Sequence, residues 1–276
     1  MTVTLTDKAK KIREYIQKSD IPDNYKYYWG YQFDLGVESI VPYIIDKKAF
    51  KPDYKVCEIG SAEGGVLHAF SLAGSGHSLG TDIALDRIEV GAKITDLTGL
   101  DVEYSAHDIL FDEIPAKWQQ EFDLVLLRDV IEHLDDTQLA LTNIKKVIKP
   151  GGHLFVTFPP YNSPYGGHQH TVAGNFASKM PYIHLLPKSI FHNMISSGRP
   201  QDIEEVRRLE HIRMNAKKFS DAARNSGYEI VNEDYYLLRP VFKMKFGLPE
   251  IKLTAIAKAP FIKNFFSLEA AFLLKA

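Results

Sequence analysis

The stretch Lys55-Val56-Cys57-Glu58-Ile59-Gly60-Ser61-Ala62-Glu63-Gly64-Gly65 determines how the rest of the chain is interpreted. It opens with a short apolar run, turns into small residues, and is followed by apolar residues at helical spacing from Val66 to Leu72. This pattern predicts a buried strand, a tight turn and the start of a helix. Such a turn lets the polar atoms of a ligand approach bare backbone. Taken alone, the stretch also fits the strand-to-helix turn of any α/β protein.

Outward from this turn, strands and helices alternate along the chain. Further strands are predicted at residues 77–82, 102–106, 122–127 and 153–158. Helices are predicted at 84–92 and 136–148, and Lys149-Pro150-Gly151-Gly152 ends the second of them. One or two helices within 202–224 and strands at 228–238 and 270–274 complete the pattern. This alternation predicts an α/β fold with a doubly wound, mostly parallel sheet.

Less regular segments surround the alternating pattern. Residues 1–50 are expected to form an N-terminal helical cap segment, in which an aromatic cluster at residues 25–33 packs on the core. A lid over a ligand is the alternative interpretation of that cluster. Residues 51–276 are expected to form one Rossmann-like domain, with insertions at about 159–214 and 241–267.

Composition limits the classes of function that the chain can have. The net charge is −2, so no global basic field favours nucleic acid as a partner. Cys57 is the only cysteine, which rules out a disulfide within the chain and fits a reducing compartment. We find neither the apolar core of a signal peptide nor an apolar run that could span a bilayer. We therefore expect a cytoplasmic protein, while the oligomeric state stays open.

Acidic residues follow the predicted strands where a nucleotide would lie. Asp82 ends the second strand, 22 residues beyond Gly60, and a carboxylate there can accept hydrogen bonds from both hydroxyls of a ribose. Asp108 follows the third strand and can accept from an adenine amino group. Each acid alone is more often a helix cap or a solvated loop residue. Together they indicate an adenosine ligand.

The ordered set of these motifs resembles a known family. Five motifs resemble those of class I S-adenosylmethionine-dependent methyltransferases, of the small-molecule type 11/12-like group, and occur in that family's order. They are the turn from Glu58 to Gly65, Asp82, His107-Asp108, the strand Phe122-Asp123-Leu124-Val125 and Lys149-Pro150-Gly151-Gly152. The resemblance covers about residues 54–231. It implies a Rossmann-like, seven-stranded sheet with an antiparallel last strand. Ala62 departs from the pattern because it stands where a second glycine is usual, and we expect a negative φ there.

The resemblance implies which residues bind S-adenosyl-L-methionine and its product S-adenosyl-L-homocysteine. Gly60, Ser61, Ala62 and Gly64 would shape the turn around the methionine part, and Glu58 would anchor its amino group directly or through water. Asp82 would hold the ribose, Asp108 with Ile109 the adenine, and Ile83 would also contact the cofactor. Arg128 could pair with a carboxylate of the cofactor or substrate, although we favour a structural pair with Asp129 or Glu132.

Methyl transfer to a hydroxyl or ammonium group requires that the nucleophile lose a proton. Three histidines are candidate bases, because an imidazole has a pKa near neutrality. His133 follows the fourth strand, and His168 and His170 lie in the loop after the fifth strand, which also offers Tyr161 and Tyr165 to a substrate. Each histidine could instead support the local backbone.

A metal site is the minority interpretation of these histidines, and we expect none. Asp129, Glu132 and His133 stand at i, i+3 and i+4, so they could share a helical face and bind a divalent ion. A similar acid-x-x-Glu-His motif occurs in metal-assisted quinone O-methyltransferases. His168, His170 and His184 could also gather around a metal, but their spacing gives no support.

The insertion at 241–266 mixes lysines with phenylalanines and isoleucines. We favour its packing on the domain with its lysines in solvent, although weak peripheral contact with a membrane is possible. Phe158-Pro159-Pro160-Tyr161 resembles a motif of DNA and protein amino-methyltransferases, but it follows the fifth strand and not the fourth, so nucleic acid is not the favoured substrate.

The sequence thus predicts a small-molecule methyltransferase that favours O-methylation. A nicotinamide-dependent oxidoreductase is the rival within the same fold, but the turn lacks a clean G-x-G-x-x-G. A non-catalytic cofactor-binding scaffold protein is the rival from another class.

Overall fold

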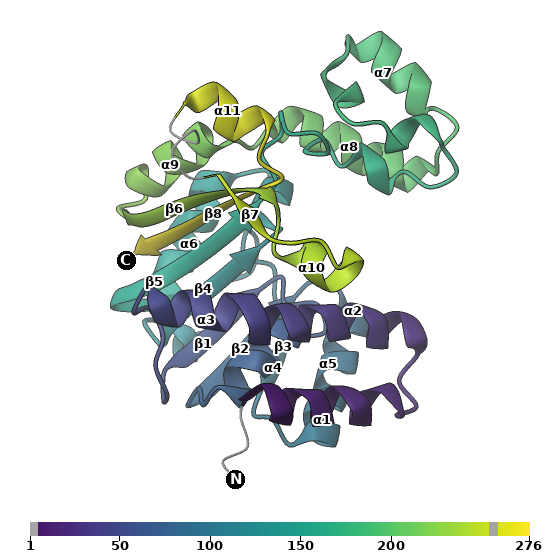
Figure 1. The fold of residues 1–276 in the computed structure, drawn as a ribbon. Coiled ribbons are helices and arrows are strands. Elements are labelled where there is room, and N and C mark those ends of the chain that lie inside the picture. The colour runs from purple at the N-terminus through teal and green to yellow at the C-terminus, as the bar shows by residue number, and fades with distance from the viewer. Residues whose placement is uncertain (1–4, 254–258) are drawn as a thin grey trace.

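A single mixed sheet organises the protein, with strand order β3-β2-β1-β4-β5-β8-β6-β7 (Figure 1). The computed structural model describes residues 5–253 and 259–276. Five parallel strands form the first half of the sheet: β1 (Lys55–Ile59), β2 (His77–Asp82), β3 (Glu103–Ala106), β4 (Phe122–Arg128) and β5 (Ile148–Phe158). The predicted strands are confirmed. The run Lys149-Pro150-Gly151-Gly152, predicted as a turn before the fifth strand, lies within β5.

The second half of the sheet is antiparallel. β8 (Glu269–Lys275) pairs antiparallel with both β5 and β6 (Glu229–Leu238), which confirms the reversed terminal hairpin. The sheet nevertheless has eight strands where seven were expected. The additional strand is the two-residue β7 (Ile251–Lys252), which the insertion adds to the open edge of β6. An edge strand offers unpaired backbone groups, so a short passing segment can join it without a long apolar signature.

Helices cover both faces of the sheet. They are α4 (Gly65–Leu72), α5 (Leu85–Thr98), α6 (Thr137–Val147) and α9 (Ala216–Asn225), with one-turn helices η2 (Ala116–Trp118) and η3 (Ile131–His133) in the loops. The carboxylate of Asp136 accepts a hydrogen bond from the backbone N–H of Leu139, and Asn215 caps α9 in the same way. These caps satisfy N–H groups that otherwise lack a partner, and so fix where the helices begin.

The N-terminal segment is a pair of antiparallel helical rods. α1 (Leu5–Gln17) is followed by α2 (Asp23–Leu35), the π-helical η1 (Gly36–Ile40) and α3 (Val41–Asp46), which continue one another without a break (Figure 1). Trp29 and Phe33 of the aromatic cluster are fully buried, with ring centroids 4.9 Å apart. The expected packing of the cluster is therefore confirmed for these two side chains.

The core lies in two layers, one on each face of the sheet. Along β1 and β4 successive side chains alternate between the layers: Val56 and Leu124 belong to one, Cys57 and Val125 to the other. All four are buried, as expected of central parallel strands covered on both faces. Burial raises the pKa of the Cys57 thiol, so this cysteine behaves as a small apolar side chain.

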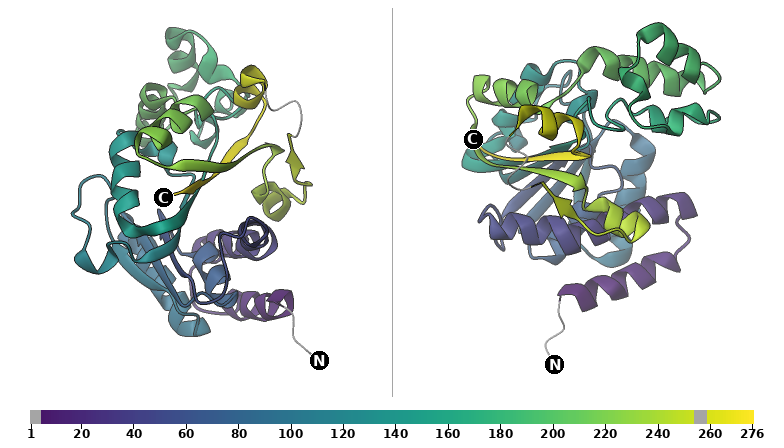
Figure 2. Two further views of the ribbon diagram at one scale, coloured as in Figure 1. Left: turned by 90° about the vertical axis from the view of Figure 1, so that its left-hand side faces the viewer. Right: turned by 45° about the horizontal axis from the view of Figure 1, so that its top comes forward.

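Two segments extend beyond the sheet. The chain after β5 contains η4 (Gln169–Thr171), η5 (Ala177–Lys179), η6 (Ile183–Leu185), α7 (Lys188–Ile195) and α8 (Pro200–Ile212). It has a small core of its own, formed by Val172, Ile183, Phe191, Ile195 and Val206. Figure 2 shows this segment at the end of the molecule opposite α1.

The second segment follows β6 and comprises α10 (Val241–Phe246), β7 and α11 (Pro260–Phe265), of which residues 254–258 lie outside the described structure. Lys243, Lys252 and Lys263 lie beside Glu38, Asp234 and Glu233, so the segment packs on the domain with its lysines largely paired. Within residues 5–253 and 259–276, every helix is too short or too polar to cross a membrane.

Candidate active site

The glycine turn after β1 is shaped by close contacts that exclude side chains. Gly60 has φ of 71°, and its N–H donates to the Thr81 carbonyl at 2.7 Å. A Cβ at Gly60 would lie 2.4 Å from Val130 Cγ2, and one at Gly64 would lie 1.9 Å from the Tyr104 hydroxyl. Both positions therefore require glycine. Gly64 serves the packing of the turn and does not itself line the cavity described below.

Ala62 adopts a conformation opposite to the one expected. Its φ is 50°, in the left-handed region, where a Cβ costs on the order of 1 kcal/mol. The expectation of a negative φ was wrong because a tertiary contact decides the conformation. The Ala62 N–H donates to Asp82 Oδ2 at 2.8 Å, which ties the turn to the end of β2.

A cavity of about 480 Å³ opens at the carboxyl ends of β1, β2, β3 and β4. Of the sequence-predicted cofactor residues, it is lined by Gly60, Ser61, Ala62, Asp82, Ile83, Asp108, Ile109 and Arg128. Asp82 accepts from Ala62 and Ala84 N–H groups through its two oxygens, and each oxygen keeps a second lone pair for a ligand hydroxyl. The cavity has the size and position of a nucleotide site in a doubly wound sheet.

These residues fit S-adenosylmethionine. The Ser61 hydroxyl is buried and has no hydrogen-bond partner among the described residues, although it lies in the cavity wall. Buried polar groups without partners are rare, so this hydroxyl is suited to a polar ligand atom. The turn at Gly60 and Ala62 has left-handed backbone and small side chains, so a ligand can approach its backbone closely.

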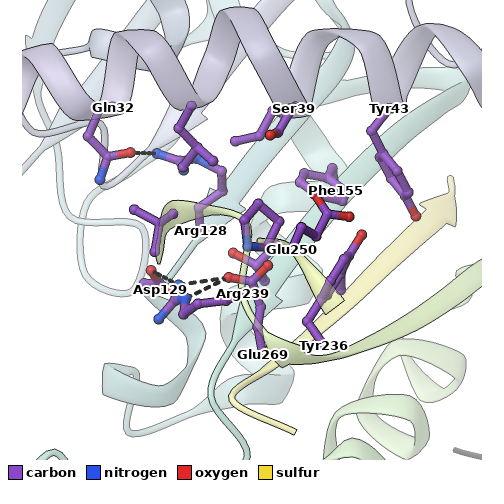
Figure 3. A pocket seen from close by; sticks show the side chains of 16 residues that line it. Gln32, Ser39, Tyr43, Arg128, Asp129, Phe155, Tyr236, Arg239, Glu250 and Glu269 are labelled. Carbon is purple, nitrogen blue, oxygen red and sulfur yellow. Dashed lines mark hydrogen bonds and ion pairs between the residues drawn. The ribbon is translucent and has the colours of Figure 1, made fainter. Parts of the chain in front are cut away.

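Glu58 and Arg128 form a buried pair, which corrects the expected partner of Arg128. Arg128 Nε lies 2.8 Å from Glu58 Oε1. Its Nη2 donates to Gln32 Oε1 at 2.8 Å, as Figure 3 shows. Arg128 therefore does not pair with Asp129 or Glu132. Glu58 is 1% exposed and does not line the cavity, and its Oε2 has no hydrogen-bond partner among the described residues. Burial raises the pKa of Glu58 although Arg128 opposes this effect.

A second buried pair adjoins the first. Arg239, after β6, lies between Asp129 at 2.5 Å and Glu269 at 2.8 Å, as Figure 3 shows. Asp129 has φ of 53°, so the loop after β4 is held in a left-handed conformation by this pair. Burial opposes ionisation of Asp129, but the charges of Arg239 and Arg128 outweigh it and lower its pKa. No sequence motif pointed to Arg239.

A larger cavity of about 750 Å³ adjoins the 480 Å³ cavity, which we call the cofactor cavity. Both cavities are lined by Tyr31, Gln32, Asp129 and His133. The larger one also contains His168, His170 and Tyr165 from the loop after β5. The structure thus brings all three candidate bases to one cavity, and we call it the acceptor cavity. Tyr31 belongs to the N-terminal aromatic cluster, so part of that cluster faces a ligand site, as the alternative interpretation proposed.

His133 stands at the junction of the two cavities. Its Nδ1 lies 2.5 Å from Glu205 Oε1 of α8, which assigns the proton to Nδ1 and leaves Nε2 able to accept one. Burial alone would lower the pKa of His133, but the hydrogen bond to Glu205 and the charge of Glu132 outweigh it and raise the pKa. Glu205 was missed because its partner lies 72 residues away in the chain.

Glu132 is a buried carboxyl group between two imidazoles. It is 3% exposed, and neither oxygen has a hydrogen-bond partner among the described residues. Oε1 lies 3.9 Å from His133 Nε2 and 3.8 Å from His168 Nε2. Burial raises the pKa of Glu132 to about 8, and burial lowers that of His168 to about 3.

The same three residues offer metal-ligand atoms within 4.8 Å of one another. This set differs from the one considered from sequence, because Asp129 is turned to Arg239 and His168 takes its place. The spacing within η3 could not reveal His168, which comes from a separate loop. His184 is not part of the cluster: its Nε2 bonds to the Tyr161 carbonyl at 2.7 Å.

Tyr161 does not line the acceptor cavity, which corrects its expected role in substrate binding. It is 4% exposed, packs edge-on against His184 with centroids 5.1 Å apart, and lies under Arg213. Tyr161 therefore anchors the start of the loop, and Tyr165 is the tyrosine of this loop that reaches the cavity.

The comparisons with known proteins agree with this geometry. Residues 50–216 match a family described as "Methyltransferase domain". The chain is 31% identical over 144 residues to "Ubiquinone biosynthesis O-methyltransferase" of Coxiella burnetii, a match that covers 51% of this chain and 57% of that protein. The chain thus spans little more than half the length of this curated relative.

Two solved structures share the fold. The putative sarcosine dimethylglycine methyltransferase of Galdieria sulphuraria has a TM-score of 0.57 at 13% identity, covering 89% of this chain and 84% of that one. Phosphoethanolamine N-methyltransferase 2 of Haemonchus contortus, in complex with S-adenosyl-L-methionine, has a TM-score of 0.54 at 17% identity, covering 96% of this chain and 59% of that one.

The site and the family match define the class. This chain belongs to the methyltransferase-domain family and has the Rossmann-like fold of the class I S-adenosylmethionine-dependent methyltransferases.

Proposed function

We propose that this protein is an S-adenosylmethionine-dependent methyltransferase that methylates a hydroxyl group of a small molecule held in the acceptor cavity. The observation that carries the proposal is the position of His133, which lines both cavities and whose Nδ1 bond to Glu205 leaves Nε2 able to accept a proton. A base at this junction would lie beside the acceptor hydroxyl at the point where the cofactor's methyl group is transferred. The single, buried cysteine supports a reducing, cytoplasmic setting.

In the proposed cofactor site, backbone groups and carboxylates would bind the polar atoms of S-adenosylmethionine. When bound, S-adenosylmethionine supplies an electrophilic methyl group. The turn at Gly60, Ser61 and Ala62 would surround its methionine part, Asp82 would accept from the ribose hydroxyls, and Asp108 would accept from the adenine amino group. Ile83 and Ile109, which line the same cavity, would contact the adenine faces.

Side chains of this protein accept the proton that the acceptor hydroxyl loses. The acceptor hydroxyl gives its proton to His133 Nε2, and Glu205 stabilises the resulting imidazolium through Nδ1. Glu132, whose oxygens have no partner among the described residues, is placed to accept a hydrogen bond from the acceptor when ionised, or to donate one when protonated. Holding the acceptor in line with the methyl group supplies the remaining rate acceleration.

Calorimetry tests the cofactor assignment. S-adenosylhomocysteine is expected to bind the wild type and to lose most of its affinity in Asp82→Ala, because the ribose loses its acceptor. Asp101→Ala is the matched control, since Asp101 is exposed and lies outside the cavity. Binding of NAD(H) in place of S-adenosylhomocysteine would contradict the proposal in favour of an oxidoreductase.

Activity tests whether the bound cofactor is used. Tritiated methyl transfer from S-adenosylmethionine to metabolites of a cell lysate is expected, and His133→Asn should slow it by about 10²-fold or more. Protein that binds the cofactor but never transfers the methyl group would instead be a non-catalytic scaffold. Products that carry the methyl group on nitrogen would overturn the choice of oxygen while leaving the class intact.

A further inference from the structure

The wall of the acceptor cavity holds two lysines that form no ion pair with a carboxylate within the described structure. Three cationic side chains line it: Lys179, Arg239 and Lys245. Two acidic residues line it as well, but both face other groups: Asp129 pairs with Arg239, and Glu132 faces His133 and His168. Within the described structure, neither lysine lies in an ion pair with a carboxylate. The cavity therefore offers two ammonium groups that an incoming ligand can neutralise.

Lys245 is the more confined of the two lysines. It belongs to α10, is partly buried, and its Nζ lies 4.1 Å from the centroid of the Tyr31 ring. Burial and then the nearby charge of Arg239 lower its pKa, while the charge of Asp129 opposes them. A contact with an aromatic face contributes only about 0.5–2 kcal/mol. An anion beside Lys245 would supply the missing partner.

The second lysine and Arg239 lie around the same histidine. Lys179, Arg239 and Lys245 all act on His170, where desolvation by the surrounding loop is the largest of the effects that lower its pKa to about 4. Lys179 Nζ donates a hydrogen bond to the His170 backbone carbonyl, which holds it at the cavity wall. The positive charges thus converge on one side of the cavity.

Apolar side chains of the same short segment form the adjoining wall. Phe242, Phe246 and Leu248 line the cavity, with Phe242 and Phe246 ring centroids 5.3 Å apart. Phe246 is 64% exposed and Leu248 42% exposed, so this wall presents apolar surface that nothing in the described structure covers. Exposed apolar surface in a cavity of this size is typical of a ligand site.

We propose that the methyl acceptor is an amphipathic organic anion whose negative group lies between Lys245 and Lys179 and whose apolar body lies against Phe242, Phe246 and Leu248. Its hydroxyl group then reaches His133 across the cavity. This inference rests on the proposed function, because it names the class of molecule that the same site takes. Carboxylate and phosphate share the required chemistry, since an ammonium group binds either one as a point charge.

Calorimetry on protein saturated with S-adenosylhomocysteine tests the inference without turnover. The probes are 4-hydroxycinnamate, its neutral methyl ester, and 4-hydroxyphenyl phosphate. We expect at least one of the two anions to bind at least tenfold more tightly than the ester. Lys245→Met should remove about tenfold of that anion affinity and leave ester binding unchanged. The tighter of the two anions distinguishes carboxylate from phosphate recognition.

Lys243→Met is the matched control. Lys243 is two residues away on α10, exposed, and paired with Glu38 at 2.7 Å outside the cavity, so its loss should leave anion affinity unchanged. Equal affinity for anions and ester, no binding of either anion, or an equal effect of the two lysine substitutions would overturn the inference. S-adenosylhomocysteine binding, measured in the same samples, reports separately on the proposed function.

Discussion

Single residues at the glycine turn show how a local rule is overridden by a tertiary contact. Ala62 holds a left-handed conformation because its N–H reaches Asp82. A sequence pattern can mark the missing glycine, but it cannot report the hydrogen bond that compensates for the Cβ.

Ala62→Gly is expected to stabilise the protein slightly. Glycine relieves a left-handed Cβ that costs about 1–2 kcal/mol, but it adds about 0.5–1 kcal/mol of chain entropy to the unfolded state. The free energy of unfolding should therefore rise by up to about 1 kcal/mol, measured by urea denaturation. A clear loss of stability would show that the alanine methyl makes a favourable contact.

The pH dependence of activity follows from His133 and Glu205. A raised pKa keeps His133 protonated up to a higher pH, so the free base is available only above that pKa and kcat/KM rises with pH. Glu205→Gln removes the hydrogen-bonded carboxylate that raises this pKa. The acidic limb of the pH profile should then move to lower pH, while a limb that does not move would exclude His133 as the titrating base.

The cluster of Glu132, His133 and His168 gives a further prediction at this scale. If His133 acts as the base, methyl transfer should survive dialysis against EDTA. A loss of activity that Mg²⁺ or Mn²⁺ restores, and that Glu132→Gln abolishes, would instead identify the three side chains as ligands of an essential ion.

At the scale of elements, Arg128 connects two strands of the sheet to the N-terminal helix α2. Arg128 at the end of β4 bonds both Glu58 of β1 and Gln32 of α2. Arg128→Met leaves a buried carboxylate without compensation and should lower the free energy of unfolding by about 3–5 kcal/mol. Arg128→Met combined with Glu58→Met should recover most of that loss, as urea denaturation of the single and double variants would measure.

An exposed pair serves as the control for that experiment. Lys217 and Asp221 on α9 lie 2.6 Å apart but are 82% and 50% exposed, so Lys217→Met should change stability by about 0.5 kcal/mol or less. Equal effects at both pairs would contradict a special role for burial at Arg128.

At the scale of the whole molecule, cofactor binding and folding are coupled. S-adenosylhomocysteine at 100 times its Kd should stabilise the native state by about 2.7 kcal/mol and raise Tm by roughly 5–10 °C. Asp82→Ala should lose this shift while Asp101→Ala keeps it, as differential scanning calorimetry would show. A comparable shift with NADH would point to the rival chemistry.

The sequence predicts the parts of the fold that obey local periodicity. The parallel strands, the two aspartates that line the cavity at strand ends and the terminal hairpin follow from apolar runs and from residues at strand ends. The partners of Glu58 and Asp129 could not be predicted, because an arginine pairs with whichever carboxylate the packing brings near. Tyr161 and Tyr165 lie in the same loop and look alike in the sequence. Only the path of the loop decides that Tyr161 is buried and that Tyr165 lines the cavity.

The two cavities differ in one wall. The cofactor cavity is built mainly within residues 50–216, the segment that matches the family, whereas the acceptor cavity is also lined by Arg239, Phe242 and Lys245 from the segment after β6. Under the proposed function, substitutions in that segment would change the choice of acceptor and leave the cofactor cavity unaltered.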